Sequence, residues 1–333
     1  MFATLISLRS ERQLMRRDAL ALEEALPTSY KRMKISLDPK KAICYSIESS
    51  QVGERMSIFD VSSAEFCIML GDMLVTDAHS SAWEAEVLSG VQGGEFNTVR
   101  RARGVFGLVS VFESQGEIRV TIGSDKLGVR PIYYWSDGSL LVVSTTLRVI
   151  ERLSLIRKFC DKRGIAETIA FGYPLSNRTQ YLDIYRIGAG EVVTFRADDV
   201  SKFQYWRWDS IGTDRTNPEE RTREAFRLFT ESVRIRQDEK NSALAFLSGG
   251  MDSRAIVGAL RANDIPVTTL NFSPDGSQDQ VLAAEIASKL RCDHIQMSHD
   301  GGDLTTFRPD LAMLYSCLLY TSDAADDDTI VVL

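Results

Sequence analysis

Apolar runs separated by polar residues occupy much of the chain, and their pattern over residues 41–210 differs from that of the segments before and after. Between residues 41 and 210, short apolar runs rich in β-branched residues are separated by polar or glycine turns; they are AICYSI, FCIMLG, GVFGLVSVF, IRVTIG, LLVVSTT and EVVTF. Such runs are typical of strands in antiparallel sheets. The segments HSSAWEAEVLSGV and CDKRGIAETIAFG predict helices between them. We therefore expect a β-rich domain over residues 41–210.

The first forty residues differ from this pattern because they are rich in charge. The segment SERQLMRRDALALEEALP has the spacing of an amphipathic helix, and Pro27 predicts its end. We interpret residues 1–40 as an extension that precedes the β-rich domain.

A polar stretch, WDSIGTDRTNPEE, predicts a boundary between two domains. Asn217 and Pro218 then supply an N-cap and a first helical position. The segments ALAFL, SGGMDS, RAIVGALRAN, VTTLNF and SQDQVLAAEIASKL predict strand, loop, helix, strand and helix. Helices alternating with continuous apolar strands indicate a doubly wound parallel sheet. The fold class is therefore α/β, with a second domain over residues 217–316.

Composition narrows the function. The chain has 333 residues, 44% hydrophobic and 26% charged, which is enough for two cores. A formal net charge of -7 offers no bulk positive field for a nucleic acid. Five cysteines without a CxxC pair, and three histidines, predict neither a disulfide framework nor a zinc site. No run predicts a signal peptide or a membrane span. We expect small-molecule chemistry in a cytoplasmic protein.

The string SGGMDS, residues 248–253, lies between a predicted buried strand and a predicted helix. Adjacent glycines let backbone N–H groups approach phosphate oxygens, and the helix N-terminus adds unpaired N–H groups and a positive dipole end. Ser248 and Ser253 add hydroxyl groups, and Asp252 adds a carboxylate of the kind that binds Mg²⁺. The alternative is a plain turn in which Asp252 or Ser253 caps the helix. The complete string in this context predicts a phosphate site.

This loop resembles the pyrophosphate-loop signature of the ATP-pyrophosphatase superfamily, and the chain resembles the asparagine synthetase family. The resemblance implies that the loop grips the β- and γ-phosphates of ATP, that AMP is transferred to a carboxylate, and that an amine then displaces AMP. It assigns pyrophosphate to Ser248, Gly249, Gly250 and Ser253, Mg²⁺ to Asp252, and the flanks of adenine to Phe246 or Leu247 and to Phe272. For Phe272, ordinary core packing is the alternative.

The first domain carries a second resemblance. GVFGLVSVF followed by GSDKLGVRPIYYW, and TQYLDIYRIGAGEVVTF ending in QYW, are similar to segments of the family's class II glutaminase domain. This implies an Ntn-type αββα sandwich. Asp125, Gly128, Arg130 and Pro131 are expected to form a structural turn with an available ion pair.

The glutaminase chemistry departs from the family pattern. The family's nucleophile is a cysteine that becomes the N-terminal residue, whereas this chain has Phe2 and no cysteine before Cys44. The family's NGE segment corresponds to Leu70, Gly71 and Asp72, so the oxyanion donor is missing. Glu84 stands where an Asp binds the glutamine amine. We expect an inactive glutaminase-like domain with Gly71, Asp72 and Glu84 as glutamine-site remnants, and no catalytic residue is identified.

The end of the sequence also departs from the family. No SGEGSDE-type loop, which closes over the nucleotide and adds a magnesium carboxylate, follows Phe272. Residues 317–333 do not continue the strand and helix rhythm and are interpreted as a foreign tail, with a genuine acidic tail as the alternative. The parallel-sheet, Rossmann-like pyrophosphate-loop domain is therefore expected to be incomplete.

The expected function is ATP-dependent amide formation resembling asparagine synthesis, with ATP and Mg²⁺ as cofactors. Its partners are a small-molecule carboxylate and an amine or ammonia, with neither nucleic acid nor membrane, and a homodimer is possible within the family. Three alternatives remain: a β-lactam synthetase or lasso-peptide cyclase-like enzyme without glutaminase activity, a nucleotide-binding pseudoenzyme, and another pyrophosphate-loop enzyme that thiolates tRNA or forms NAD.

Overall fold

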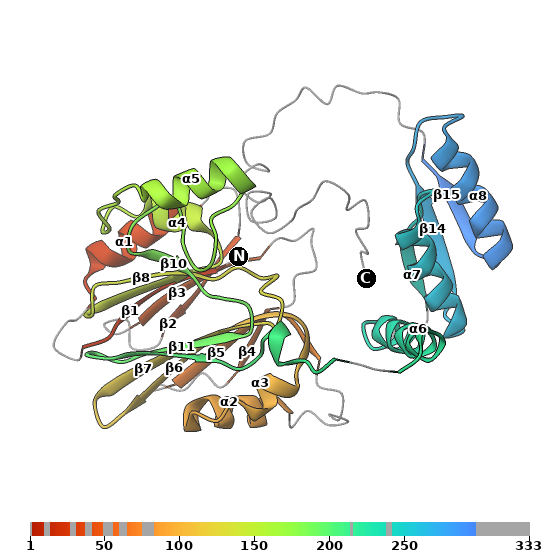
Figure 1. Cartoon of the computed structure of the whole chain (residues 1–333). Coiled ribbons are helices and arrows are strands. Elements are labelled where there is room, and N and C mark those ends of the chain that lie inside the picture. Colours follow the sequence, from red (N-terminus) through yellow and green to blue (C-terminus); the bar gives the residue numbers. More distant parts are fainter. Residues whose placement is uncertain are drawn as a thin grey trace. The chain divides into compact units, whose positions relative to one another are not determined.

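The computed structural model describes residues 2–9, 14–26, 31–36, 42–48, 56–59, 65–74, 83–213, 216–237 and 242–297. It divides the chain into two compact units, the first running to Ile211 and the second starting at Gly212 (Figure 1). The division falls within the polar stretch WDSIGTDRTNPEE. Among the described residues, no helix has the length and apolar character that crossing a bilayer requires.

The first unit contains two six-stranded sheets, and every described strand pair in them is antiparallel. One sheet has the order β10-β8-β9-β1-β3-β2 and consists of β1 (Phe2–Ser7), β2 (Lys31–Ser36), β3 (Ala42–Glu48), β8 (Tyr133–Ser136), β9 (Leu140–Ser144) and β10 (Ile184–Arg186). The other has the order β12-β11-β7-β6-β5-β4 and consists of β4 (Met56–Phe59), β5 (Glu65–Leu74), β6 (Arg103–Ser114), β7 (Glu117–Ser124), β11 (Glu191–Phe195) and β12 (Val200–Gln204).

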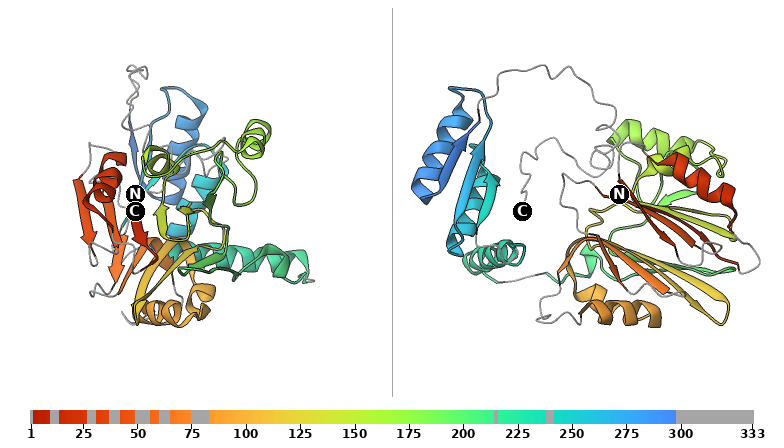
Figure 2. Two further views of the ribbon diagram at one scale, coloured as in Figure 1. Left: turned by 90° about the vertical axis from the view of Figure 1, so that its left-hand side faces the viewer. Right: turned by 180° about the vertical axis from the view of Figure 1, so that it is seen from behind.

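Helices cover the outer faces of both sheets (Figures 1 and 2). The helices α1 (Arg16–Ala25), α4 (Leu147–Arg152) and α5 (Lys162–Phe171) lie on the side of the first sheet, and α2 (Trp83–Gly93) and α3 (Asn97–Arg101) lie on the side of the second. A short 3₁₀ turn, Trp208–Ser210, follows β12. The unit is therefore an αββα sandwich, and the predicted fold class is confirmed.

Alternation along the strands produces the layers. In β6, Val109 and Val111 face the core between the two sheets, whereas Phe106 and Leu108 face the core beneath α2 and α3. Successive side chains of a strand point to opposite faces, so one apolar run serves two cores. Both faces of these strands are consequently buried, which explains their continuous apolar sequence.

The prediction that residues 1–40 form a separate extension is wrong. The strand β1 lies inside the first sheet, paired on one side with β3 and on the other with β9. Its Leu5 is fully buried in the core that also contains Leu22 of α1. The strand and the helix therefore belong to the sandwich. The physical reason is that the partners of β1 come from distant parts of the chain, which a local pattern does not reveal.

The turn after β7 is organised by Asp125. Its buried carboxylate accepts hydrogen bonds from the backbone N–H groups of Leu127 at 2.9 Å, Val129 at 3.3 Å and Arg130 at 3.2 Å. Its backbone carbonyl accepts the N–H of Gly128 at 3.1 Å. A buried carboxylate with several N–H donors holds a turn rigidly, so the structure gives Asp125 the expected structural role.

The second unit is a parallel three-stranded sheet with helices. It contains α6 (Pro218–Arg234), β13 (Ala243–Phe246), α7 (Met251–Ala262), β14 (Val267–Asn271), α8 (Gln278–Leu290) and β15 (Asp293–Gln296), and its strand order is β13-β14-β15. Both strand pairs are parallel. Asn217 caps α6 by accepting the N–H of Glu220 at 2.9 Å, and Pro218 is the first helical residue. This part matches the predicted Rossmann-like arrangement.

Candidate phosphate-binding site

The loop 247–250 lies at the carboxyl end of β13, beside the turn that follows β14. Because β13 and β14 are parallel, both strands end at the same edge of the sheet. The backbone N–H of Leu247 donates to the carbonyl of Leu270 at 2.9 Å, which continues the pairing into the loop. Residues from two loops and two helices therefore meet at this edge.

Ser248 and Ser253 close the loop upon itself. The hydroxyl of Ser253 accepts the backbone N–H of Ser248 at 3.2 Å, and the two hydroxyl oxygens lie 3.1 Å apart. The hydroxyl of Ser248 also accepts the N–H of Gly250 at 3.2 Å. Ser253 is only 4% exposed. The hydroxyl groups that are predicted to bind pyrophosphate therefore also stabilise the conformation of the loop.

The N-terminus of α7 has no side-chain cap. Its N-cap is Gly250, with φ -71° and ψ 166°, and a glycine has no side chain to accept from the N–H groups of the first helical turn. Neither Asp252 nor Ser253 occupies the capping position, so the alternative of a plain capped turn does not describe this helix end. Asp252 lies exposed in the first helical turn. Uncapped N–H groups and the positive end of a 12-residue helix together favour an anion.

The two aromatic residues predicted beside adenine lie together. Phe246 and Phe272 meet edge to face, with ring centroids 5.6 Å apart and an interplanar angle of 85°. Phe272 is 54% exposed, so it is not an ordinary core residue. Leu247, the other candidate beside Phe246, is 1% exposed and packs in the core of the unit. Of the two candidates Phe246 and Leu247, Phe246 is therefore the one that is partly accessible.

Three residues that the sequence analysis did not predict also contact the loop. The carboxylate of Asp279, in the first turn of α8, accepts the backbone N–H of Gly249 at 3.2 Å. The guanidinium of Arg254 donates to the carbonyl of Gly249 at 3.1 Å. Asn271 donates to the carbonyl of Leu247 at 2.7 Å. Each of them stands at the end of β14 or in the first turn of α7 or α8, and such positions next to the predicted loop could have indicated a contact with it.

The described residues at this edge offer few side chains that could bind a metal ion. Among the residues that the structure describes, no group of three or more His, Cys, Asp and Glu side chains is arranged for a metal ion. Asp252 and Asp279 are nevertheless carboxylates, the oxygen donors that suit Mg²⁺. A magnesium ion here would therefore take most of its ligands from a bound phosphate and from water, as it does at many nucleotide sites.

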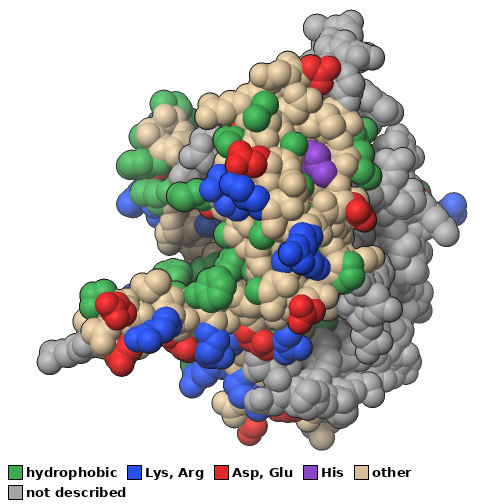
Figure 3. Space-filling model, turned by 90° about the vertical axis from the view of Figure 1, so that its right-hand side faces the viewer, with side chains coloured by type: hydrophobic (Ala, Val, Ile, Leu, Met, Phe, Trp, Pro, Cys, Tyr) green, Lys and Arg blue, Asp and Glu red, His purple; other side chains and the backbone are tan. Residues whose placement is uncertain are grey.

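The charges around this unit are mixed in sign. On the described surface that Figure 3 presents, Lys and Arg side chains are interspersed with Asp and Glu side chains. Such a surface produces no extended field of one sign.

The second predicted site, in the first unit, is only partly described. Gly71 lies in β5 with φ +79°, and a Cβ there would overlap the carbonyl oxygen of Val105, so no other residue fits easily. Asp72 is exposed. The side chain of Glu84 in α2 lies outside the described residues.

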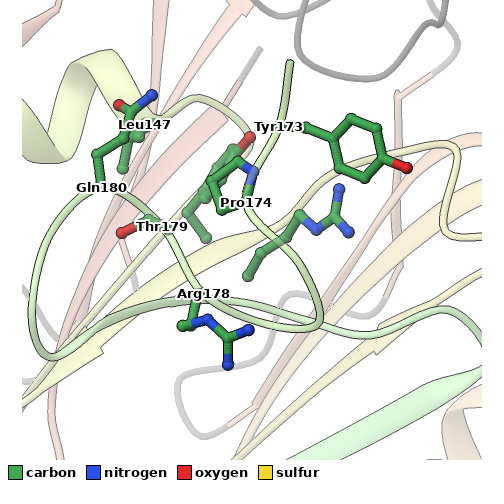
Figure 4. A pocket seen from close by; sticks show the side chains of 8 residues that line it. Leu147, Tyr173, Pro174, Arg178, Thr179 and Gln180 are labelled. Atoms are coloured by element: carbon green, nitrogen blue, oxygen red, sulfur yellow. The ribbon is translucent and has the colours of Figure 1, made fainter. Parts of the chain in front are cut away.

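A pocket in the first unit belongs to neither predicted site. Figure 4 shows the side chains that line it, most of them from the segment that joins α5 to β10; the labelled residues are Leu147, Tyr173, Pro174, Arg178, Thr179 and Gln180. Arg178 donates to Glu167 through two of its nitrogens, and Thr179 donates to the carbonyl of Ile184 at 2.8 Å. These polar side chains are engaged within the protein and hold the segment in place.

Comparison with protein families places two known domains on the chain. A glutamine amidotransferase domain matches residues 76–206, and the described part of this range, from residue 83 on, lies in the sandwich. An asparagine synthase family matches residues 224–326, which include the loop 248–253. The two matches follow each other in the same order as the two units.

Individual relatives agree with these matches. A Methanocaldococcus jannaschii protein named for a glutamine-hydrolyzing asparagine synthetase is 27% identical over 170 residues, covering 50% of this chain and 32% of that protein. Asparagine synthetase 3 of Bacillus subtilis, also named as glutamine-hydrolyzing, is 28% identical over 137 residues, covering 40% and 22%. The amidase chyE of Penicillium rubens is 20% identical over 208 residues, covering 61% and 29%. The matched part thus spans less than a third of each relative.

Among solved structures, glutamine phosphoribosylpyrophosphate amidotransferase from B. subtilis aligns with 94% of this chain and 63% of its own, at 10% identity and a TM-score of 0.33. A likeness of this size carries no conclusion about the present chain.

Proposed function

Because the chain belongs to an asparagine synthetase-like family, with a glutamine amidotransferase domain followed by an asparagine synthase domain, we propose that its second unit binds ATP at residues 248–253 and activates a carboxylate for amide formation. In this reaction the carboxylate attacks the α-phosphate of ATP, pyrophosphate leaves, and an amine then displaces AMP from the acyl adenylate. Because the chain covers less than a third of each relative, the complete reaction and its substrates are also part of this proposal.

The observation that carries the proposal is the uncapped N-terminus of α7 behind a loop of two glycines. The serine pair Ser248 and Ser253 holds that loop closed, and the N-cap Gly250 has no side chain to accept from the N–H groups of the first helical turn. A pyrophosphate group would supply acceptors for these donors. A preorganised set of donors of this kind stabilises charge as it develops on the leaving group.

Asp252 is the residue we propose as the metal ligand. It is exposed in the first turn of α7, beside the helix end that would hold the phosphates. Mg²⁺ bound with the nucleotide neutralises phosphate charge and makes pyrophosphate a better leaving group. The contribution of Asp252 is to hold the metal complex of the nucleotide in register with the loop.

Phe246 and Phe272 are proposed to hold adenine. Their edge-to-face pair stands at the ends of β13 and β14, next to the phosphate loop, and Phe272 exposes half of its side chain. Aromatic faces offer a flat apolar surface to a base. This arrangement would place adenine beside the sheet edge and the phosphates at α7.

The amine is proposed to be ammonia or a group already within the substrate. Leu70 stands where the resemblance places the asparagine of the glutaminase oxyanion hole, so release of ammonia from glutamine is not expected. The lack of this donor at residue 70 favours relatives such as β-lactam synthetases and lasso-peptide cyclases, which use an internal amine, alongside ammonia-using asparagine synthesis.

Calorimetric titration of the chain with Mg-ATP tests the proposal. We expect binding that excess Mg-pyrophosphate prevents and that Asp252→Ala weakens by about 10-fold or more, since a charged contact contributes about 1.5–3 kcal/mol. Asp264→Asn, a charge change just beyond the opposite end of α7, is the control and should leave the affinity unchanged. Release of pyrophosphate with L-aspartate and ammonium would then identify one carboxylate. Nucleotide binding that is indifferent to both pyrophosphate and Asp252→Ala would refute the assigned site.

A further inference from the structure

Asp279 makes an unusual contact with the phosphate loop. It belongs to α8, the helix after the second strand, yet its carboxylate accepts the backbone N–H of Gly249 at 3.2 Å. The approach is close: a Cβ on residue 249 would lie 2.7 Å from the Asp279 oxygen and 3.0 Å from the side chain of Leu282. A side chain at residue 249 would therefore displace the carboxylate of Asp279 or the side chain of Leu282.

The backbone N–H groups of residues 248, 249 and 250 donate to acceptors of different charge. The N–H of Ser248 is held by the hydroxyl of Ser253, and the N–H of Gly250 by the hydroxyl of Ser248. These hydroxyl groups are neutral and can rotate to donate to an arriving phosphate. The N–H of Gly249, by contrast, is held by an anion, so a phosphate oxygen that takes this donor competes with a carboxylate of the same sign.

We propose that Asp279 is a specificity-determining residue, which makes the loop select the magnesium complex of a diphosphate or triphosphate over the free anion. This inference rests on the proposed function of the loop. A metal-free pyrophosphate meets both the repulsion of Asp279 and an occupied donor. A magnesium complex brings a cation for which the carboxylates of Asp252 and Asp279 are favourable neighbours.

A simple structural role for Asp279 leads to a different expectation. If its hydrogen bond only braced the loop, removal of the charge would leave the preference for the metal complex unchanged, and removal of the acceptor would weaken both forms alike. Asp279→Asn separates these cases, because the amide oxygen still accepts the N–H of Gly249 while the negative charge is gone.

The experiment is a calorimetric titration of the whole chain with pyrophosphate, first with excess Mg²⁺ and then in EDTA. Its readout is the ratio of the two affinities. We expect the ratio to fall at least about fivefold in Asp279→Asn, mainly because the metal-free affinity rises once a nearby like charge is removed. The matched control is Asp275→Asn, in the turn before α8, whose carboxylate accepts from Gln280 at 3.1 Å and not from the loop.

The outcomes are distinct. A lower ratio in Asp279→Asn together with an unchanged ratio in Asp275→Asn supports the inference. An unchanged ratio in Asp279→Asn, or an equal fall in both variants, overturns it. If the native chain binds pyrophosphate in neither condition, the proposed function of the loop fails instead. Far-UV circular dichroism and thermal melting confirm that each variant is folded before titration.

Discussion

The side-chain amide of Asn271 donates a hydrogen bond to the backbone carbonyl of Leu247 at 2.7 Å, and its oxygen accepts the backbone N–H of Ser273 at 2.8 Å. One buried side chain thus joins the start of the phosphate loop to the turn after β14. Every donor and acceptor involved is a group that would be costly to leave unpaired.

Replacing Asn271 by Ala is expected to lower the free energy of unfolding of the second unit by about 1–3 kcal/mol, because Leu247 and Ser273 each lose a hydrogen-bond partner. All four tryptophans, Trp83, Trp135, Trp206 and Trp208, precede this unit, so amide hydrogen exchange over residues 243–297 is the appropriate measurement. The exposed residue change Gln278→Ala serves as control and should stay within about 0.5 kcal/mol. Equal protection in both variants would contradict this role of Asn271.

The place of β1 in the sandwich leads to a second prediction. Leu5→Ala removes a fully buried side chain from the core beneath α1, which should cost the first unit about 2–5 kcal/mol. Leu20→Ala, on the exposed side of α1, should cost far less. Tryptophan fluorescence during urea unfolding reports on this unit alone. Similar midpoints for the two variants would mean that β1 does not belong to the core.

Gly71 and Gly116 separate steric overlap from backbone strain. Both have positive φ, +79° and +81°, but a Cβ at Gly71 would overlap the carbonyl oxygen of Val105, whereas a Cβ at Gly116 meets nothing within 4 Å. Gly116→Ala should therefore cost about 1–2 kcal/mol for its left-handed conformation, and Gly71→Ala clearly more. The urea midpoint of tryptophan fluorescence measures both. Equal losses would show that the backbone at Gly71 relaxes freely.

Glu167 predicts an acid-sensitive contact in the first unit. It accepts from Arg178 Nε at 2.9 Å, from Arg163 Nε at 3.1 Å and from the backbone N–H of Leu175 at 2.9 Å. These hydrogen bonds, that of Arg178 foremost, lower the pKa of Glu167 from 4.5 to about 2. Because the pKa is lower in the folded state, the stabilisation is complete above about pH 4.5 and is lost as the pH falls toward 2.

The variant Glu167→Gln should therefore melt at a lower temperature than the native chain at pH 7, and the difference should shrink between pH 4.5 and 2. Glu95→Gln, a change at an exposed position of the same unit, provides the matched control and should show no such trend. Thermal melts followed by tryptophan fluorescence supply the data. A difference in melting temperature that is independent of pH would disagree with the lowered pKa.

Strands and helices whose apolar pattern is local could be predicted from the sequence. Contacts between residues far apart in the chain could not. The runs that form β6 and β7 are adjacent and strongly apolar, so their pattern sufficed. The strand β1 is six residues long, and its partners β3 and β9 lie far along the chain, so nothing in its surroundings marked it as a central strand.

The same contrast applies to the phosphate site. Residues 248–253 form one contiguous string, and their chemistry could be inferred from residue type. Asp279 and Asn271 reach the loop only because β13 and β14 pair in parallel with a particular register. From the sequence alone, several polar residues after β14 were equally good candidates for contact with the loop. The assignments of pyrophosphate, metal and adenine to individual residues stay predictions.

The most direct test of the account is a titration of the ¹⁵N-labelled chain with Mg-ATP, in which the backbone amide resonances of Gly249, Gly250 and Asp252 are followed by NMR. We predict that the amides of residues 249–253 shift most, and that Mg-pyrophosphate reproduces these shifts while the aromatic resonances of Phe246 and Phe272 respond to ATP alone. Saturable shifts confined to other parts of the chain, with the loop amides unmoved, would contradict the claim that this loop binds the phosphates of ATP.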